Sequence, residues 1–241
     1  MESRSFDESR WADHEFSQDY RDEANHYLPF RQLFFQVAKS VVEHFLPEKA
    51  PLRLLDLGCG DGLFIDQLGP RSSDEVLLVD GSPAMLEAAQ KRLKTSICRN
   101  ISYIPSSFQE LIERDPLPRR FDFIFSALAI HHLSATDKVS LFNYIYQHLD
   151  KDGVFINYDV VLAPSKPLED WYISFWQESI ERNIQTELKE KIQRVPYQYK
   201  DNPDNLPDTL EYQMEALKEI GFSNVDCYFK FGVFCLFGGT K

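Results

Sequence analysis

Short apolar stretches and longer amphipathic stretches alternate along most of the chain. The short stretches lie at 52–57, 76–80, 101–105, 121–126 and 154–161. Between them, apolar residues recur every three or four positions, which is the spacing of a helix that buries one face. Strands that alternate with helices predict an α/β domain in which a mostly parallel sheet is covered by helices on both faces.

The first apolar stretch leads into a glycine-rich turn, Asp-Leu-Gly-Cys-Gly-Asp-Gly at 56–62, and then into a helix. A strand, a tight glycine turn and a helix N-terminus together form a cradle for a nucleotide-like ligand. The acidic Asp56 beside this turn favours a ligand with an ammonium group over one with a pyrophosphate. Cys59 inside the turn is interpreted as a small residue that fills space rather than as a nucleophile, because no histidine lies near it in the sequence.

The second apolar stretch ends at Asp80, whose carboxylate can accept hydrogen bonds from both hydroxyls of a ribose. Ser82 and Pro83 then begin a helix, as a cap and a first-turn proline. Through the stretches LLDLGCGDG, VLLVDGSPAML and FDFIFSALAIHHL, the chain resembles the class I S-adenosylmethionine-dependent methyltransferases. The resemblance is dense over 53–158 and looser in the C-terminal part. It implies that the cofactor is S-adenosylmethionine.

The resemblance also implies which residues surround that cofactor. The glycine turn would contact its amino-acid end, Asp80 its ribose and Met85 its adenine face. In many relatives a tyrosine and an arginine of an N-terminal helical segment contact the methionine end. Tyr20 and Arg31 fit these two roles, with ordinary surface roles as the equal alternative. The cofactor-binding residues expected from the resemblance are Tyr20, Arg31, Asp56, Gly58, Cys59, Gly60, Asp80, Gly81, Met85, Ser107, Phe108, Ser126 and Ala127.

One position departs from the family pattern. In the family the third strand is commonly followed by a Gly-Asp pair that recognises the adenine amino group, whereas Ser106 and Ser107 stand there in this chain. A serine oxygen can still accept that hydrogen bond. Phe108, the next residue, could lie against the adenine ring.

The fourth strand ends at the carboxyl edge of the sheet, where ligands bind in open α/β sheets. Ser126 and Ala127 are therefore expected beside the reacting sulfonium. Two adjacent histidines follow, and His131 is expected to face the acceptor as a base or an orienting group, with a buried structural role as the alternative. Asp159, at the exit of the fifth strand, is a second base, a substrate anchor or the cap of the next turn.

The sequence predicts one domain over 1–241, with a cofactor-binding core at 52–163. Residues 1–48 are expected to form an N-terminal helical cap. Within this cap, 1–13 are polar and expected to be frayed, and a helix begins at Pro29.

The segment 164–207 is too long for a simple connection, and we interpret it as a helical lid insertion over the substrate. Its apolar positions recur at helical spacing and are Trp171, Ile173, Phe175, Trp176, Ile180, Ile184, Leu188 and Ile192. Residues 208–241 supply a helix and two strands, and the last strand inserts antiparallel to its neighbours. The predicted fold is therefore a Rossmann-like, doubly wound sheet of seven strands.

The composition of the chain limits the kinds of molecule that we expect it to bind. The formal net charge is -12 and no block is rich in Lys or Arg, which disfavours a nucleic-acid partner. The four cysteines have no Cys-x-x-Cys spacing and no paired histidines, so no metal is expected. A polar N-terminus and the lack of an apolar run of ~20 residues predict a cytoplasmic protein without a membrane span. The expected partner is a small-molecule acceptor, and a homodimer is left open.

These observations together predict an enzyme that transfers the methyl group of S-adenosylmethionine to an oxygen or nitrogen atom of a small molecule. One alternative is a tRNA-modifying methyltransferase, or an enzyme like carboxy-S-adenosylmethionine synthase that remakes the cofactor itself. A non-catalytic cofactor-binding regulator is an alternative of another class. A NAD-dependent dehydrogenase is the last alternative. Leu63 argues against it, because the dinucleotide fingerprint needs a small residue at this position.

Overall fold

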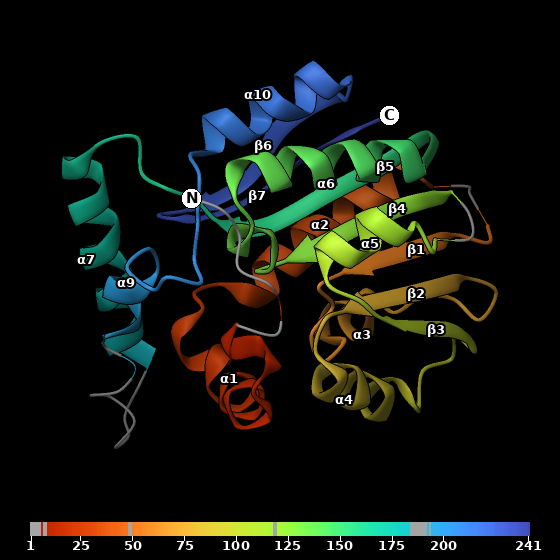
Figure 1. Cartoon of the computed structure of the whole chain (residues 1–241), viewed down its shortest axis with the longest axis horizontal. Helices are drawn as coiled ribbons and strands as arrows, with labels where there is room; N and C mark the ends of the chain where they lie inside the picture. The colour runs from red at the N-terminus through yellow and green to blue at the C-terminus, as the bar shows by residue number, and fades with distance from the viewer. Residues whose placement is uncertain (1–5, 7–8, 48–49, 118–119, 184–191, 193) are drawn as a thin grey trace.

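The computed structural model describes residues 1–241 apart from 1–5, 7–8, 48–49, 118–119, 184–191 and 193. In this part of the chain, seven strands form one sheet in the order β3-β2-β1-β4-β5-β7-β6, with helices on both faces (Figure 1). The strands are β1 (Arg53–Leu57), β2 (Glu75–Asp80), β3 (Asn100–Pro105), β4 (Phe121–Ala127), β5 (Leu149–Val160), β6 (Ser223–Phe231) and β7 (Phe234–Thr240). The α-helices are α1 (His14–Tyr27), α2 (Arg31–Phe45), α3 (Leu63–Leu68), α4 (Pro83–Leu93), α5 (Phe108–Arg114), α6 (Ala135–His148), α7 (Lys166–Asn183), α9 (Val195–Gln198) and α10 (Leu210–Ile220), and the 3₁₀-helices are η2 (Arg10–Ala12) and η3 (Ile130–His132).

Strands β1 to β5 run parallel, and β7 pairs antiparallel with both β5 and β6. This confirms the predicted seven-stranded sheet whose last strand runs against its neighbours. Strand β5 begins at Leu149 rather than at Val154, because its ladder with β4 continues past an irregularity between Phe121 and Phe123. The strand order reverses between β1 and β4, and in such sheets the crevice at this point holds the ligand.

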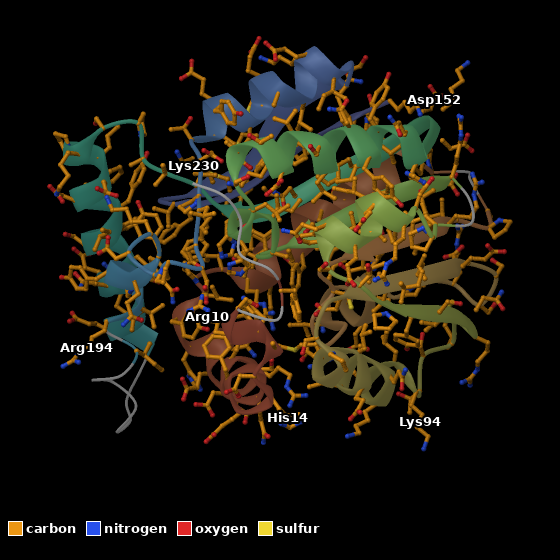
Figure 2. The ribbon with its side chains drawn as sticks, viewed as in Figure 1. Arg10, His14, Lys94, Asp152, Arg194 and Lys230 are labelled. Carbon is orange, nitrogen blue, oxygen red and sulfur yellow. The ribbon has the colours of Figure 1, made fainter. Side chains whose placement is uncertain are left out.

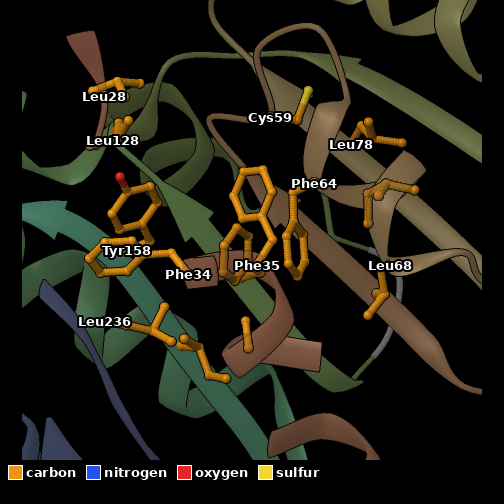
Figure 3. Close-up of a cluster of buried hydrophobic side chains, with 14 of the residues drawn as sticks. Leu28, Phe34, Phe35, Cys59, Phe64, Leu68, Leu78, Leu128, Tyr158 and Leu236 are labelled. Atoms are coloured by element: carbon orange, nitrogen blue, oxygen red, sulfur yellow. The ribbon is translucent and has the colours of Figure 1, made fainter. Parts of the chain in front are cut away.

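Two apolar cores lie on the two faces of the sheet, because neighbouring strand residues point to opposite sides. Leu54 belongs to one core and Leu55 to the other. In the first core, Phe34 of α2 stacks on Tyr158 of β5 with ring centroids 4.2 Å apart, and Phe64 of α3 lies in the same cluster (Figure 3). This packing fixes α2 and α3 against the carboxyl half of the sheet.

The N-terminal part is more ordered than the sequence predicted. The expected frayed segment 1–13 contains η2 among its described residues, and residues 1–5 and 7–8 lie outside them. A separate helix, α1, precedes α2, because the Asp13 side chain accepts hydrogen bonds from the backbone N–H groups of Glu15 and Phe16. Helix α1 buries only Ser17 and Ala24, so it lacks the apolar stripe that would have revealed it.

The insertion 164–207 contains α7 and α9 in its described part, whereas Ile184 and Leu188 of the predicted apolar pattern lie outside the described residues. Trp176 of α7 donates from Nε1 to the carbonyl oxygen of Tyr27 at 2.6 Å, which ties α7 to the end of α1. In the described part of the chain, no helix is both long and apolar enough to span a membrane.

Candidate functional site

The glycine turn after β1 is shaped by three left-handed glycines, Gly58, Gly60 and Gly62, with φ of 67°, 53° and 74°. The N–H groups of Gly58 and Cys59 donate to the carbonyl oxygen of Val79, at 2.8 and 3.0 Å, so the turn lies against the end of β2. A Cβ at Gly58 would stand 2.4 Å from the Ala129 Cβ, whereas one at Gly60 would meet nothing within 4 Å. The turn is therefore closely packed at its first glycine and open at its second.

Asp80 lies at the end of β2 and faces this turn. Its two carboxylate oxygens accept hydrogen bonds from the backbone N–H groups of Gly60 and Ser82, each at 2.8 Å. Burial raises the pKa of Asp80 to about 6, while these two hydrogen bonds act in the opposite direction. A carboxylate oxygen can accept more than one hydrogen bond, so Asp80 keeps acceptor capacity for a ribose.

Asp56 at the end of β1 is 1% exposed, and both of its carboxylate oxygens are buried without a hydrogen-bond partner in the described part of the chain. Burial raises the pKa of Asp56 well above its ordinary value, and the nearby Asp80 and Asp61 raise it further. Asp56 lines the cavity described below. A buried acid without a partner is complementary to a cation, so this position fits the ammonium group of an amino-acid ligand.

A cavity of about 220 Å³ lies at the carboxyl edge of the sheet, over the turn. The structure brings together around it nearly all of the residues expected to bind the cofactor. Those that line it are Tyr20, Arg31, Asp56, Gly58, Cys59, Gly60, Asp80, Gly81, Met85, Ser107, Phe108 and Ala127. Ser126 is fully buried outside the lining, where its hydroxyl donates to the carbonyl oxygen of Leu57 at 2.7 Å.

Two of these residues, Ser107 and Cys59, have local features that bear on their roles, and the role of Ser107 was not assigned by the sequence analysis. Ser107 is the N-cap of α5, and its hydroxyl accepts the backbone N–H of Glu110 while the Glu110 carboxylate accepts the backbone N–H of Ser107. Burial and the surrounding carboxylates raise the pKa of the Cys59 thiol. A protonated thiol is a poor nucleophile, which agrees with the interpretation of Cys59 as a filler.

The N-terminal segment closes one side of the cavity through Trp11. Its Nε1 donates to Nε2 of His132 at 2.9 Å, and Nδ1 of His132 in turn donates to the carbonyl oxygen of Asp204 at 2.7 Å. Trp11 also packs edge-on against Tyr20 with ring centroids 4.9 Å apart. Figure 2 shows the neighbouring Arg10 in the middle of the molecule beside α1. Three distant parts of the chain therefore meet at His132.

His131 and Asp159, the predicted catalytic residues, are paired with each other. Nδ1 of His131 lies 2.6 Å from Oδ1 of Asp159, and both side chains are buried. Neither residue lines the cavity, whereas the adjacent His132 does, with the two histidine rings 3.9 Å apart. A hydrogen bond to this carboxylate places a proton on Nδ1, and in the neutral tautomer of the ring the lone pair is then on Nε2.

Several lining residues were missed by the sequence analysis, among them Phe6, Trp11, Arg21, His132 and Asp204. The aromatic residues of the charged N-terminal segment were the only available signal for Trp11. Of the predicted lid, the cavity meets the loop after α9 and not the aromatic residues of α7. Among the described residues, no cluster of three or more His, Cys, Asp or Glu side chains could hold a metal ion.

Comparisons with known proteins match both the core and the whole chain. A family model described as a methyltransferase domain matches residues 54–153. A carboxy-S-adenosyl-L-methionine synthase from Nautilia profundicola is 21% identical over 100% of both chains. A malonyl-[acyl-carrier protein] O-methyltransferase from Bacillus cereus is 28% identical over 61% of this chain and 51% of its own. The solved structure of an O-methyltransferase family protein from Burkholderia thailandensis shares the fold with a TM-score of 0.67, at 13% identity over 98% of this chain and 62% of its own.

Proposed function

Because the chain belongs to the class I S-adenosylmethionine-dependent methyltransferases, we propose that it methylates an oxygen or nitrogen atom of a small-molecule acceptor. The observation that carries this proposal is the lining of the cavity. It includes the glycine turn, where the cofactor fits, and also Trp11, His132 and Leu206. A partly aromatic pocket beside the cofactor suits a small planar or apolar acceptor better than a polymer.

The cofactor, S-adenosylmethionine, supplies an electrophilic methyl group on a sulfonium. The residues of the chain fit its polar groups: Asp56 would receive the ammonium group, Arg31 the carboxylate and Asp80 the ribose hydroxyls. The cavity lining includes all three. In this proposal, residues 1–48 act as a cap that excludes water. Positioning of the acceptor in line with the methyl group provides much of the increase in the rate of methyl transfer.

We assign the general base to His131. Of the two adjacent histidines, His132 uses both ring nitrogens, one on Trp11 and one on Asp204. His131 uses only Nδ1, toward Asp159, and no partner of its Nε2 is seen in the described part of the chain. A hydroxyl or protonated amine would pass its proton to this Nε2. His131 does not line the cavity and its ring centroid lies 3.9 Å from that of His132, so the assignment requires the acceptor to reach past the His132 ring.

The test uses S-adenosylmethionine with a deuterated methyl group and a panel of small phenols, amines and carboxylic acids. Mass spectrometry should find the label in one class of acceptor, with formation of S-adenosylhomocysteine that depends on that acceptor. Cofactor binding without acceptor-dependent turnover would favour a non-catalytic regulator. Transfer to tRNA in the same assay would contradict the small-molecule proposal.

One observation favours a second candidate, an enzyme like carboxy-S-adenosylmethionine synthase. Full-length similarity, at 21% identity, is to a protein of that name. Such an enzyme would yield a carboxylated cofactor rather than a methylated acceptor. The mass of the cofactor recovered after incubation with organic acids separates the two candidates, because only the second predicts a heavier cofactor with its methyl carbon retained.

A further inference from the structure

Two arginines line the cavity without an acidic partner. The Nε atoms of Arg21 and Arg31 are buried, and neither has a hydrogen-bond partner in the described part of the chain. Arg31 donates from Nη1 only to the neutral side-chain oxygen of Asn25, at 3.2 Å. No ion pair of Arg21 or Arg31 is found among the described residues. Both side chains are half-buried as a whole, and the buried Nε of each loses water without gaining an acceptor, so both guanidinium groups are available to an anion.

The acids around the cavity are engaged elsewhere, with one exception. Asp61 pairs with Arg92. Asp80 accepts two backbone N–H groups, and Asp204 accepts the backbone N–H of Arg10 at 3.3 Å. Among the described acids that line the cavity, only Asp56 is buried without a partner. The described lining therefore holds two arginines without an acidic partner and one carboxyl group without a hydrogen-bond partner, although the chain as a whole has a formal net charge of -12.

The cofactor accounts for one group of each sign. Its ammonium group matches Asp56, and its carboxylate matches Arg31, as proposed above, in the bidentate geometry that guanidinium groups favour. The second arginine is left facing the same cavity, whose remaining wall includes Trp11, His132 and Leu133. We infer, on the basis of the proposed function, that the acceptor is itself an acid: a small planar molecule with a carboxylate or similar oxyanion, held by the arginine that the cofactor does not use.

The test distinguishes the roles of the two arginines by measuring ligand affinities, and it does not require catalytic turnover. Arg21→Gln and Arg31→Gln are compared with the wild type and with Arg99→Gln. Arg99 is an exposed arginine outside the cavity, bonded to the carbonyl oxygen of Lys94, and its replacement controls for the lost charge. Calorimetry gives the affinity for S-adenosylhomocysteine. Ligand-observed NMR then gives the affinity of the cofactor-loaded protein for benzoate and for benzamide, its neutral analogue.

We expect the loaded wild-type protein to bind benzoate more tightly than benzamide. Arg31→Gln should lose about tenfold or more in affinity for S-adenosylhomocysteine, as the loss of a charged hydrogen bond implies. Arg21→Gln should keep that affinity within about twofold and lose its preference for benzoate. Arg99→Gln should behave as the wild type does.

Two results would overturn the inference while leaving methyl transfer intact. One is an equal affinity of the wild type for benzoate and benzamide. The other is a loss of S-adenosylhomocysteine affinity in both variants, with benzoate binding unchanged relative to the wild type, which would mean that both arginines hold the cofactor carboxylate. A wild-type protein that fails to bind S-adenosylhomocysteine would refute the proposed function itself, and the two failures are therefore distinguishable.

Discussion

Replacement of Gly58 by alanine tests the geometry on which the cofactor site depends. Gly58 has φ of 67°, a conformation that costs an L-residue about 1–2 kcal/mol. The added methyl group would also stand 2.4 Å from the Cβ of Ala129 and 3.2 Å from the Cζ of Phe108. Overpacking of this kind costs about 1–3 kcal/mol. The expected loss in free energy of unfolding for Gly58→Ala is therefore about 2–5 kcal/mol.

Two other glycines serve as matched controls, because they share the backbone conformation without the crowding. Gly69, at the end of α3, has φ of 66° and no atom within 4 Å of an added Cβ. Gly69→Ala should therefore show the backbone cost alone, about 1–2 kcal/mol. Gly60→Ala, with φ of 53° and equally open surroundings, should cost a similar amount. Because Gly60 lines the cavity, its added methyl group should in addition weaken S-adenosylhomocysteine binding.

Urea unfolding followed by tryptophan fluorescence gives the three stabilities, and calorimetry gives the affinities of the variants that fold. The difference between Gly58→Ala and Gly69→Ala isolates the contact with Ala129 and Phe108. Equal stabilities for these two variants would refute the packing argument. Unchanged S-adenosylhomocysteine affinity in Gly60→Ala would show that the cofactor does not lie over the turn.

Asp80→Asn should weaken S-adenosylhomocysteine binding by about 1–3 kcal/mol, because a charged acceptor is lost, and an unchanged affinity in calorimetry would remove Asp80 from the ribose site. The pKa of Asp80 is about 6 and the ribose needs the ionised form, so wild-type affinity should fall as the pH drops through about 6. The same titration on Asp80→Asn should be flat in this range, and a matching fall in both proteins would assign the effect to another group. His131→Ala should lower kcat by about 10²–10⁴ with little change in cofactor affinity, and Asp159→Asn should lower it by less; normal turnover in His131→Ala would leave only a structural role. Trp11→Phe keeps an aromatic ring but removes the hydrogen bond to His132, so S-adenosylhomocysteine affinity should fall by about 0.5–1.5 kcal/mol if the cap covers the cofactor. The same affinity as the wild type would separate the cap from cofactor binding.

The sequence predicted the sheet and the residues that gather around the glycine turn because both depend on local patterns. Buried strands read as continuous apolar stretches, and the turn after β1 needs glycine wherever φ is positive, as at Gly58 and Gly60. Asp56 and Asp80 end neighbouring strands, and parallel strands bring their carboxyl ends to one edge. The parallel pairing of β1 with β2 is therefore enough to bring Asp56 and Asp80 to the same cavity.

The acceptor end could not be predicted in the same way, because its groups come from segments far apart in the sequence. Trp11 meets His132 only because η2 lies against η3, the turn that follows β4, and the backbone of Asp204 completes the contact. Which of two adjacent histidines faces the cavity depends on the direction of a 3₁₀ turn, and the sequence favoured His131 where the lining contains His132.

The chain by itself determined the strands, the glycine turn and the acids that border it, since these follow from apolar periodicity and backbone sterics over short stretches. Tertiary structure alone decided which side chains remain without partners inside the cavity. Arg21 resembles any surface arginine in the sequence, and Arg31 was singled out only through the family resemblance. The packing of the N-terminal helices buries the Nε atoms of both at the cavity. Whether a charge is satisfied depends on every element around it, and no local pattern encodes that.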